Sequence, residues 1–170
     1  MTISLKKINN KDFDDIYNLT TDDKIMKWVG NRRPWTEKKV KNFICYNKKE
    51  EKQKDRKVFY WKIVNKKEFI GIIGIHKYEN EDRYYMTIFT KRESQGKGYA
   101  TKSMIKALKE FHKLKKDVDY IYSQSLQDNK KVKKLMERIH FEKMDETIER
   151  LGKVYDIYKS KKLKDYKGFK

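Results

Sequence analysis

A short glycine-containing turn is the segment of this chain whose residues point most directly to chemistry. Residues 95–100 read Gln-Gly-Lys-Gly-Tyr-Ala, with glycines at alternate positions where the backbone can approach a ligand without a Cβ in the way. Residues 84–90 are β-branched or aromatic apart from Met86, which favours a strand. From Tyr99 onward, apolar residues recur at a helical spacing. A helix that begins at such a turn presents free N–H groups, which suit a phosphate.

Two common phosphate-binding motifs do not fit this turn. The dinucleotide fingerprint has three glycines, but Ala100 and Thr101 follow the second glycine too soon. The phosphate loop that ends in Gly-Lys-Ser/Thr is also absent. The pattern that remains is Gln-x-x-Gly-x-Ala, made by Gln95, Gly98 and Ala100.

The rest of the chain predicts the elements that hold this turn in place. Residues 58–90 contain three strand-like runs with short connections, which predicts an antiparallel meander. The expected strands cover residues 3–8, 58–64, 68–78, 83–90, 118–125, 141–144 and 154–159. The expected helices cover residues 9–20, 36–52, 99–114 and 129–139. The fold class is therefore α/β (α+β), with a mixed, mostly antiparallel, twisted sheet of six to seven strands and about four helices on both faces.

The organisation of the chain predicts one domain over residues 1–163 and a basic tail over residues 164–170. The single cysteine, Cys45, permits no internal disulfide, and no N-terminal signal segment is visible. The longest apolar run, residues 69–75, is too short to span a membrane. We therefore expect a cytoplasmic protein, monomer or homodimer, with no membrane association.

The net charge of +19 raises the question of a nucleic-acid partner. Lysine outnumbers arginine by 37 to 7, and the lysines are spread along the whole chain. Reading of bases and bidentate phosphate contacts favour arginine, so we expect no specific nucleic-acid site. A basic nucleic-acid-binding module remains the alternative to an enzyme.

The three histidines do not indicate a metal site. His76, His112 and His140 lack the spacing of metal ligands, so no metal is expected. The sequence places His76 at the solvent edge of its strand and His112 on a helix surface.

Three motifs, in this order along the chain, resemble those of one protein family. Residues 95–101 are similar to the coenzyme A pyrophosphate loop of the GNAT superfamily of N-acetyltransferases. The family's Asn-x(5)-Leu-x-Glu-x(3)-Phe helix and exit is matched by Asn129, Leu135, Glu137 and Phe141. Residues 152–156, Gly-Lys-Val-Tyr-Asp, resemble its closing turn and strand. The similarity covers residues 3–163, and the branch that it resembles contains ribosomal-protein N-terminal alanine acetyltransferases and spermidine acetyltransferases.

The resemblance implies that acetyl-CoA is the cosubstrate and that its pyrophosphate binds the amides of the turn. It also implies that strand 83–90 splays from strand 118–125 and that the freed backbone groups pair with pantetheine. The Ile88 N–H then faces the thioester carbonyl and stabilises the developing oxyanion. Asn129 would hold the pantetheine amide. The implied cofactor-binding residues are Ile88, Phe89, Thr90, Gln95, Gly96, Lys97, Gly98, Tyr99, Ala100, Thr101 and Asn129.

The chain departs from the family's pattern where protons are handled. Many relatives carry a Glu on the meander strand, and Tyr84 or Tyr85 takes its place here. A Tyr on the later helix is replaced by Met136, which cannot donate a proton, and His140 replaces a glycine. Neighbouring strand residues point to opposite faces, so only one tyrosine can face the cleft. Parity with Ile88 favours Tyr84, whereas a bulge would favour Tyr85; a catalytically inactive homologue is a further alternative.

The acceptor is expected to be a small-molecule or peptide amine. The family builds its acceptor cleft from the connection between the first two helices, the meander strand and the loop before the last strand. The substrate-binding residues implied there are Asp22, Asp23, Trp28, Trp35, Asp145 and Glu146. Acidic groups at these places suit a cationic amine such as a protein N-terminus or a polyamine, and ordinary surface charge is the alternative reading. The basic background instead favours an amino sugar on an anionic nucleotide carrier.

Overall fold

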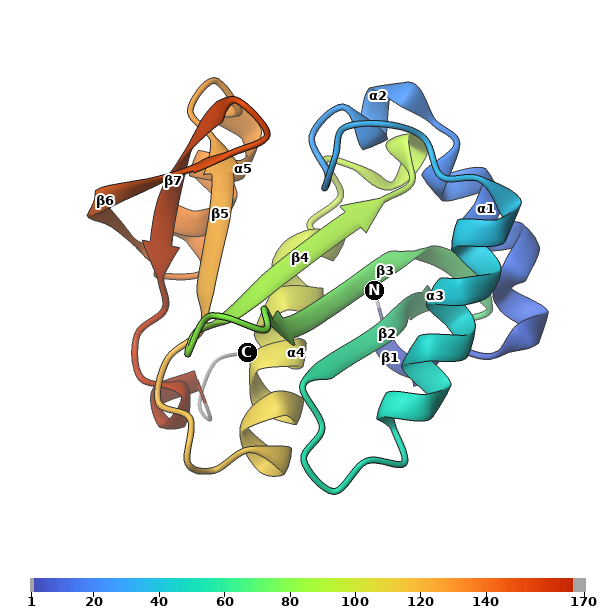
Figure 1. The fold of residues 1–170 in the computed structure, drawn as a ribbon, viewed down its shortest axis with the longest axis horizontal. Coiled ribbons are helices and arrows are strands. Elements are labelled where there is room, and N and C mark those ends of the chain that lie inside the picture. The colour runs from blue at the N-terminus through green and yellow to red at the C-terminus, as the bar shows by residue number, and fades with distance from the viewer. Residues whose placement is uncertain (1, 167–170) are drawn as a thin grey trace.

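The computed structural model describes residues 2–166 and contains one seven-stranded sheet with the order β1-β2-β3-β4-β5-β7-β6 (Figure 1). The strands are Ile3–Lys7 (β1), Val58–Asn65 (β2), Glu68–Lys77 (β3), Tyr84–Thr90 (β4), Tyr122–Leu126 (β5), Glu142–Arg150 (β6) and Lys153–Lys159 (β7). Neighbouring strands are antiparallel except β4 and β5, which are parallel. The predicted fold class and the three-stranded meander are confirmed.

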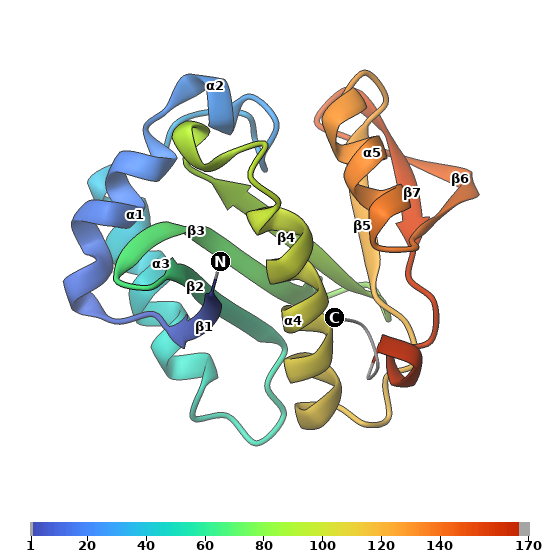
Figure 2. The ribbon, with the colours of Figure 1, turned by 180° about the vertical axis from the view of Figure 1, so that it is seen from behind.

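Helices cover both faces of the sheet. The α-helices are Phe13–Thr20 (α1), Asp23–Met26 (α2), Glu37–Glu50 (α3), Tyr99–Leu114 (α4) and Lys130–Arg138 (α5), and short 3₁₀ turns cover Asn10–Asp12, Arg92–Ser94 and Leu163–Tyr166. Helices α1 and α3 lie on one face, and α4 lies on the other (Figure 2). Each face has its own buried apolar cluster, one centred on Phe111 of α4 and one on Ile16 of α1 and Ile44 of α3.

Helix starts follow the caps that the sequence predicts. The Asn9 side chain accepts from the Lys11 N–H at 2.9 Å, and the Asp12 carboxylate accepts from the Asn9 N–H at 2.8 Å, which forms a capping box before α1. Thr36 caps α3 by accepting from the Lys39 N–H. Such caps contribute about 1 kcal/mol each, so local sequence fixes where these helices begin.

The sheet opens between β4 and β5. Strand β4 follows β3 along its whole length, from the pair Lys77–Tyr84 to the pair Gly71–Thr90. Strand β5 instead follows β7. Among the described residues, Tyr85 and Tyr122 form the one registered pair between β4 and β5. The two strands diverge from this end, and the opening is visible in Figure 1.

Three predicted boundaries are wrong. Residues 23–26, predicted as irregular, form α2. Strand β5 begins at Tyr122, because residues 118–121 have no registered partner. The predicted connection 145–153 is mostly strand, since β6 continues to Arg150 and turns through Leu151 and Gly152, whose φ angles are +51° and +69°. A solvated edge strand can be rich in charges, and this hid β6 from a reading based on hydrophobicity.

The folded part of the chain also extends beyond residue 163. Residues 163–166 form a 3₁₀ turn, and Tyr166 is fully buried with its hydroxyl donating to the Ile139 carbonyl at 2.8 Å. Residues 164–166 of the predicted tail therefore pack on the domain, and residues 167–170 lie outside the described part of the chain. Among the described residues, no helix combines the length and apolarity that a membrane crossing requires.

We expect Gly71→Ala to destabilise the fold by about 3 kcal/mol, as overpacking of a tight core contact does. A Cβ at Gly71 would lie 2.3 Å from the Phe89 carbonyl oxygen and 2.8 Å from the Thr90 Cα, both backbone atoms of β4. Gly152→Ala is the control: its Cβ would meet nothing within 4 Å, so only the left-handed backbone strain of about 1–2 kcal/mol applies. Urea unfolding measures both, and equal losses would contradict the close approach of β3 to β4.

Candidate active site

The turn before α4 exposes backbone donors. Gly96 and Gly98 both have φ of +77°, a left-handed conformation that other residues adopt only with strain. Gly98 is the N-cap of α4, and no side chain caps this end. The helix closes its first bond from the Lys102 N–H to the Gly98 carbonyl at 3.3 Å, so the N–H groups of residues 99–101 have no acceptor within the helix. A Cβ on Gly96 would meet nothing within 4 Å. The turn is therefore open and suited to an anion.

The side chains of the turn are arranged around this open backbone. Lys97 is exposed, whereas Tyr99 points back to the sheet, where its hydroxyl accepts from the Asn65 Nδ2 at 3.1 Å. This contact ties the start of α4 to β2. Tyr99 therefore holds the turn in place, and its backbone rather than its ring is available to a ligand.

The β5-facing edge of β4 presents backbone groups to the opening. The Lys91 N–H donates to the Ile70 carbonyl of β3 at 2.9 Å. Backbone groups of a strand alternate between its two edges, so those of Ile88 and Thr90 face away from β3, toward β5. The Gln95 Nε2 reaches the Thr90 carbonyl at 3.5 Å, which agrees with this orientation. Because β5 has already diverged there, the Ile88 N–H points into the opening.

Two other predicted cofactor residues behave differently. By the same alternation, the backbone of Phe89 faces β3, and its ring lies 6.1 Å from that of Trp35. Phe89 therefore offers no group to the opening, and its predicted role in cofactor binding is corrected. Asn129 is half-buried and caps α5, where its Oδ1 accepts from the Val132 N–H at 3.3 Å. Only its side-chain NH₂ group could then donate to a ligand.

The two adjacent tyrosines of β4 take opposite faces. Tyr84 lies in the α4-side core, with its ring 5.0 Å from Phe111 and 6.4 Å from Phe59. Tyr85 lies on the other face. Tyr84 and Ile88 both pack against the α4-side core, as expected for a regular strand, and which of the two tyrosines handles the proton stays a prediction. The Ile88 group that matters is a backbone N–H in the plane of the sheet, and side-chain parity says nothing about which face an acceptor approaches.

Tyr85 belongs to a polar network that joins three strands and a turn. The Arg150 Nη2 of β6 donates to the Glu81 carboxylate at 2.6 Å, and its Nε donates to the Gln124 Oε1 of β5 at 2.9 Å. The Gln124 Nε2 donates to the Tyr78 hydroxyl at 3.2 Å. The Arg150 guanidinium also lies over the rings of Tyr78 and Tyr85, at 4.4 and 5.9 Å. Arg150 thus fixes the C-terminal hairpin against the end of β4 that meets β5.

Burial and hydrogen bonds set the protonation of this network. Burial, with a hydrogen bond to Glu81, raises the pKa of Tyr85 to about 12, although Arg83 opposes the shift. Burial alone would raise the pKa of Glu81, but hydrogen bonds from Arg150 and Tyr85 outweigh it and hold that pKa below its usual value. At neutral pH the network therefore contains a neutral Tyr85 and an ionised Glu81.

The acidic residues predicted to attract a cationic acceptor are partly neutralised. Asp22 receives a hydrogen bond from the Arg92 Nε at 2.6 Å, which lowers the pKa of Asp22. Glu146 lies on β6 rather than on a loop, and it pairs with Arg83. Asp145 is an exposed residue of β6. These acids therefore do not form the free acidic cluster that the sequence predicts.

The predicted aromatic residues also separate. Trp28 is 37% exposed beside α2. Trp35 packs against Phe43 at 5.2 Å and against Phe89, so it belongs to the edge of the α1–α3 core. Asp23 lies in the first turn of α2. Of these three, Asp23 and Trp28 have exposed side chains, whereas Trp35 is half-buried.

A bridge that the sequence does not predict joins two segments 119 residues apart in the chain. The Arg32 Nη2 donates to the Leu151 carbonyl at 3.0 Å, which links the α2–α3 connection to the β6–β7 turn. A cavity of about 410 Å³ lies there, lined by Asn31, Arg32, Arg33 and Leu151. Two arginines thus border the side of the molecule where the hairpin meets the N-terminal helices.

Two departures from the family's pattern have structural explanations. Met136 is 2% exposed and packs in the α4-side core, which explains the apolar side chain at this position. His140 has φ of +59° directly after α5, where the Phe141 N–H donates to the Met136 carbonyl at 2.9 Å. This is the left-handed position that favours glycine after a helix.

His76 is not at a solvent edge. Its ring stacks on Tyr60 at 6.1 Å and meets Tyr78 edge-on at 4.9 Å. Burial, together with the charge of Arg150, lowers the pKa of His76 to about 4. His76 is therefore a neutral packing residue on the face that carries Tyr85.

Sequence reasoning missed Glu81, Arg83 and Arg150. Residues 79–83 read as a charged hairpin connection, and Arg150 fell in a predicted loop. The available signal was the density of charges just before β4, but their partners come from β6, about 65 residues later. Only the three-dimensional arrangement brings them together.

The fold thus combines a parallel strand pair that opens toward one end with an uncapped, glycine-containing helix start. The chain belongs to the GNAT acetyltransferase family, since the family model described as an acetyltransferase (GNAT) domain matches residues 2–142. A search of curated proteins finds no match.

Solved structures of low sequence identity share the fold. The spermidine N-acetyltransferase from Vibrio cholerae, in complex with CoA and spermine, is 19% identical with a TM-score of 0.76, over 96% of this chain and 97% of that one. AAC(6')-Ib, in complex with ribostamycin and coenzyme A, is 16% identical with a TM-score of 0.80, over 100% and 99%. The ribosomal alpha-N-protein acetyltransferase RimL, in complex with coenzyme A, is 14% identical with a TM-score of 0.78, over 94% and 93%.

The half-buried His76 should make stability depend on pH. Its folded pKa of about 4 is below the ordinary value of 6.5, so it contributes stability that is present above about pH 6.5 and is lost as the pH falls toward 4. At about 1.4 kcal/mol per pKa unit, the loss is roughly 2–3 kcal/mol. Urea unfolding from pH 7 to 4 should show this component in the wild type and in His112→Gln, but not in His76→Phe. A component that persists in His76→Phe would contradict the assignment.

Proposed function

We propose that this protein transfers the acetyl group of acetyl-CoA to a primary amine, by direct attack in a ternary complex. One observation carries the proposal: the open edge of β4 and the uncapped start of α4 lie in succession along the chain, joined by residues 91–98. The open amides of residues 96–101 would hold the pyrophosphate. The β4 edge, with Ile88 and Thr90, would pair with the pantetheine arm.

The residues of the chain have distinct roles in this reaction. The Ile88 N–H would donate to the thioester carbonyl oxygen and stabilise the negative charge that develops there during attack. The amine nitrogen forms the new C–N bond, the C–S bond breaks, and coenzyme A leaves as its thiol. The amine would approach on the side of the sheet where Tyr85 lies, opposite the α4-side core that holds Tyr84.

The acceptor is proposed to be a primary amine on a protein N-terminus, a polyamine or another small molecule. The acetyltransferases of known structure that share the fold include complexes with spermine and with ribostamycin. The pairing of Asp22 and Glu146 with arginines weakens the case for a polycation. Arg32 and Arg33 beside the cavity favour the alternative, an amino sugar on an anionic carrier.

The first test is binding of coenzyme A and acetyl-CoA, measured by calorimetry. Gly98→Leu should reduce affinity at least 100-fold, because a side chain there would block the phosphate and strain the turn. Gly152→Leu has the same left-handed strain at a distant turn and should bind normally. No binding by the wild type would contradict the proposed function.

The acetyltransferase and the nucleic-acid-binding module predict different salt dependences for DNA binding. If the net charge of +19 is background, binding to a mixed-sequence DNA duplex should disappear between about 50 and 200 mM salt, since it rests only on counterion release. Fluorescence anisotropy across this range measures it. A complex of defined site size that survives at 150 mM salt would favour the nucleic-acid-binding module.

A further inference from the structure

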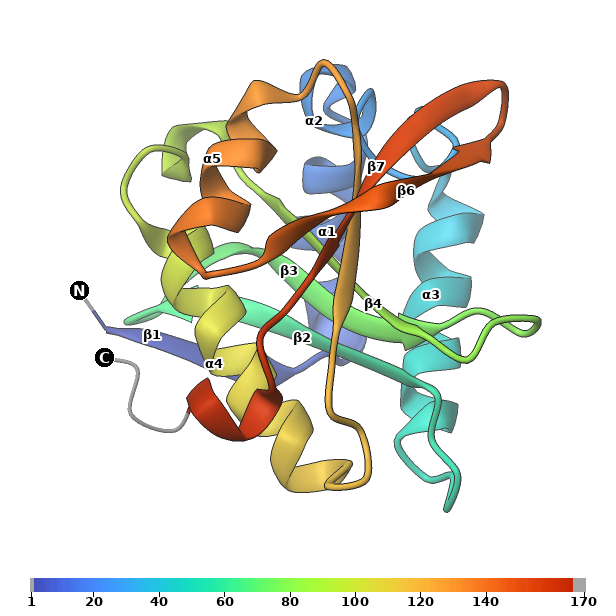
Figure 3. The same cartoon turned by 90° about the vertical axis from the view of Figure 1, so that its left-hand side faces the viewer.

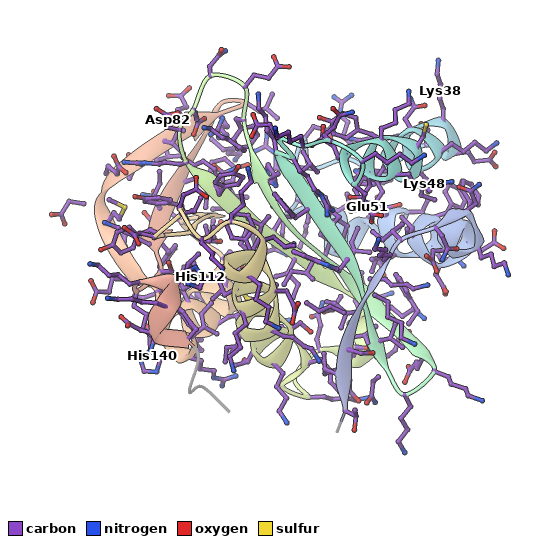
Figure 4. The ribbon with its side chains drawn as sticks, turned by 90° about the horizontal axis from the view of Figure 1, so that it is seen from below. Lys38, Lys48, Glu51, Asp82, His112 and His140 are labelled. Carbon is purple, nitrogen blue, oxygen red and sulfur yellow. The ribbon has the colours of Figure 1, made fainter. Side chains whose placement is uncertain are left out.

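The turn between β3 and β4 brings a carboxylate beside the end of β4 that meets β5. Glu81 lies in this turn, beside the β6–β7 hairpin, and Figure 4 shows the position of the turn through the neighbouring Asp82. The turn and the hairpin are also seen from the hairpin side in Figure 3. Nothing in the family match assigns a role to Glu81, and no Glu occupies β4 itself.

Glu81 is held in place but remains accessible. One carboxylate oxygen accepts from the Arg150 Nη2 at 2.6 Å, and Tyr85 is hydrogen-bonded to the carboxylate. The side chains of Glu81 and Arg150 are 25% and 26% exposed. A carboxylate has about four acceptor positions, so positions remain that an amine N–H can use.

The surroundings keep Glu81 ionised. The groups that face it are Arg150 from β6, Tyr78 and Arg83 from the same turn, His76 from β3 and Tyr85 from β4. Arg83 is itself paired with Glu146, and His76 is uncharged at neutral pH. The hydrogen bond from Arg150 is therefore the largest influence that favours the carboxylate form.

The other candidates on this face are occupied. Asp22 is paired with Arg92, and Glu146 with Arg83. Tyr85 is 2% exposed, and its hydroxyl already bonds to Glu81 and Arg83. Glu81 is thus the ionised group beside the β4–β5 junction that is both oriented and within reach of solvent.

We propose that Glu81 binds the ammonium of the acceptor and accepts the proton that this group must lose before attack. Tyr85 and Arg150 are positioning residues that orient the carboxylate. The proton moves from the ammonium nitrogen to a Glu81 oxygen, directly or through one water, and then to solvent; the neutral amine attacks the thioester, and its second proton leaves with the thiolate sulfur. This inference rests on the proposed function and supplies the base that β4 lacks.

The decisive comparison is Glu81→Gln with Glu79→Gln, which removes the same charge from an exposed position in the same turn. The probes are spermine, ribostamycin and a peptide with a free N-terminus, and release of the coenzyme A thiol is measured. Glu81→Gln should lower kcat/KM about 100-fold or more for any probe that the wild type acetylates. Glu79→Gln should stay within about twofold. Calorimetry should show unchanged coenzyme A binding in both variants.

The pH profile separates a base from a merely structural residue. Arg150→Gln and Tyr85→Phe should move the acidic limb of kcat/KM to higher pH, because each removes a hydrogen bond that favours the ionised carboxylate. Tyr84→Phe, in the core, should leave the limb in place. Full activity of Glu81→Gln, or an unmoved limb in Arg150→Gln, overturns the role of Glu81. If the wild type does not bind coenzyme A, or acetylates none of the three probes, the proposed function is overturned as well.

Discussion

The single parallel contact between β4 and β5 is the constraint on which the site depends. Tyr85 and Tyr122 hold the two strands together at one end. Beyond that point β4 stays with β3 and β5 stays with β7, and each antiparallel ladder satisfies one edge of its strand. The other edge of β4 is then left with unpaired backbone groups, which are costly unless water or a ligand binds them. The opening is therefore a direct result of sheet topology, and it supplies a row of donors and acceptors to an extended ligand arm.

The start of α4 and the Arg150 network complete the site in different ways. At the start of α4 the glycines have no side chains and the N-cap has no capping group. The N–H groups of this helix start are therefore open. The network relies on contact, because Arg150 joins the late hairpin to the turn before β4. The same contacts neutralise acidic groups and keep one carboxylate ionised. The proposed site would thus bind the anionic cofactor at the open edge of β4 and the start of α4, and would handle the cationic acceptor beside the turn before β4.

Much of the fold could be predicted from the sequence, because the signals were local. The meander followed from β-branched runs with short connections, and Asn9, Thr36 and Asn129 marked helix starts through their own hydrogen bonds. The glycine turn was visible for the same reason. What failed was non-local. Charged β6 is stabilised by pairing with β7 rather than by its own apolar face, and the partners of Glu81 and Glu146 come from elements distant in the chain. The face of the sheet on which the Tyr85 ring lies depends on which helices pack on each face. The alternation of side chains along a strand does not determine this.

The central claim is that the β5-facing edge of β4 and the start of α4 form one acetyl-CoA site. Backbone amide NMR, recorded with and without acetyl-CoA, tests it most directly. We expect the largest shift changes and slowed hydrogen exchange at Ile88, Thr90 and residues 96–101, because within residues 2–166 these N–H groups have no backbone acceptor and a bound ligand would supply one. Little change should occur at the β3-facing amide of Phe89. Changes confined to other parts of the chain, with the amides of Ile88 and residues 96–101 unaffected, would contradict the account.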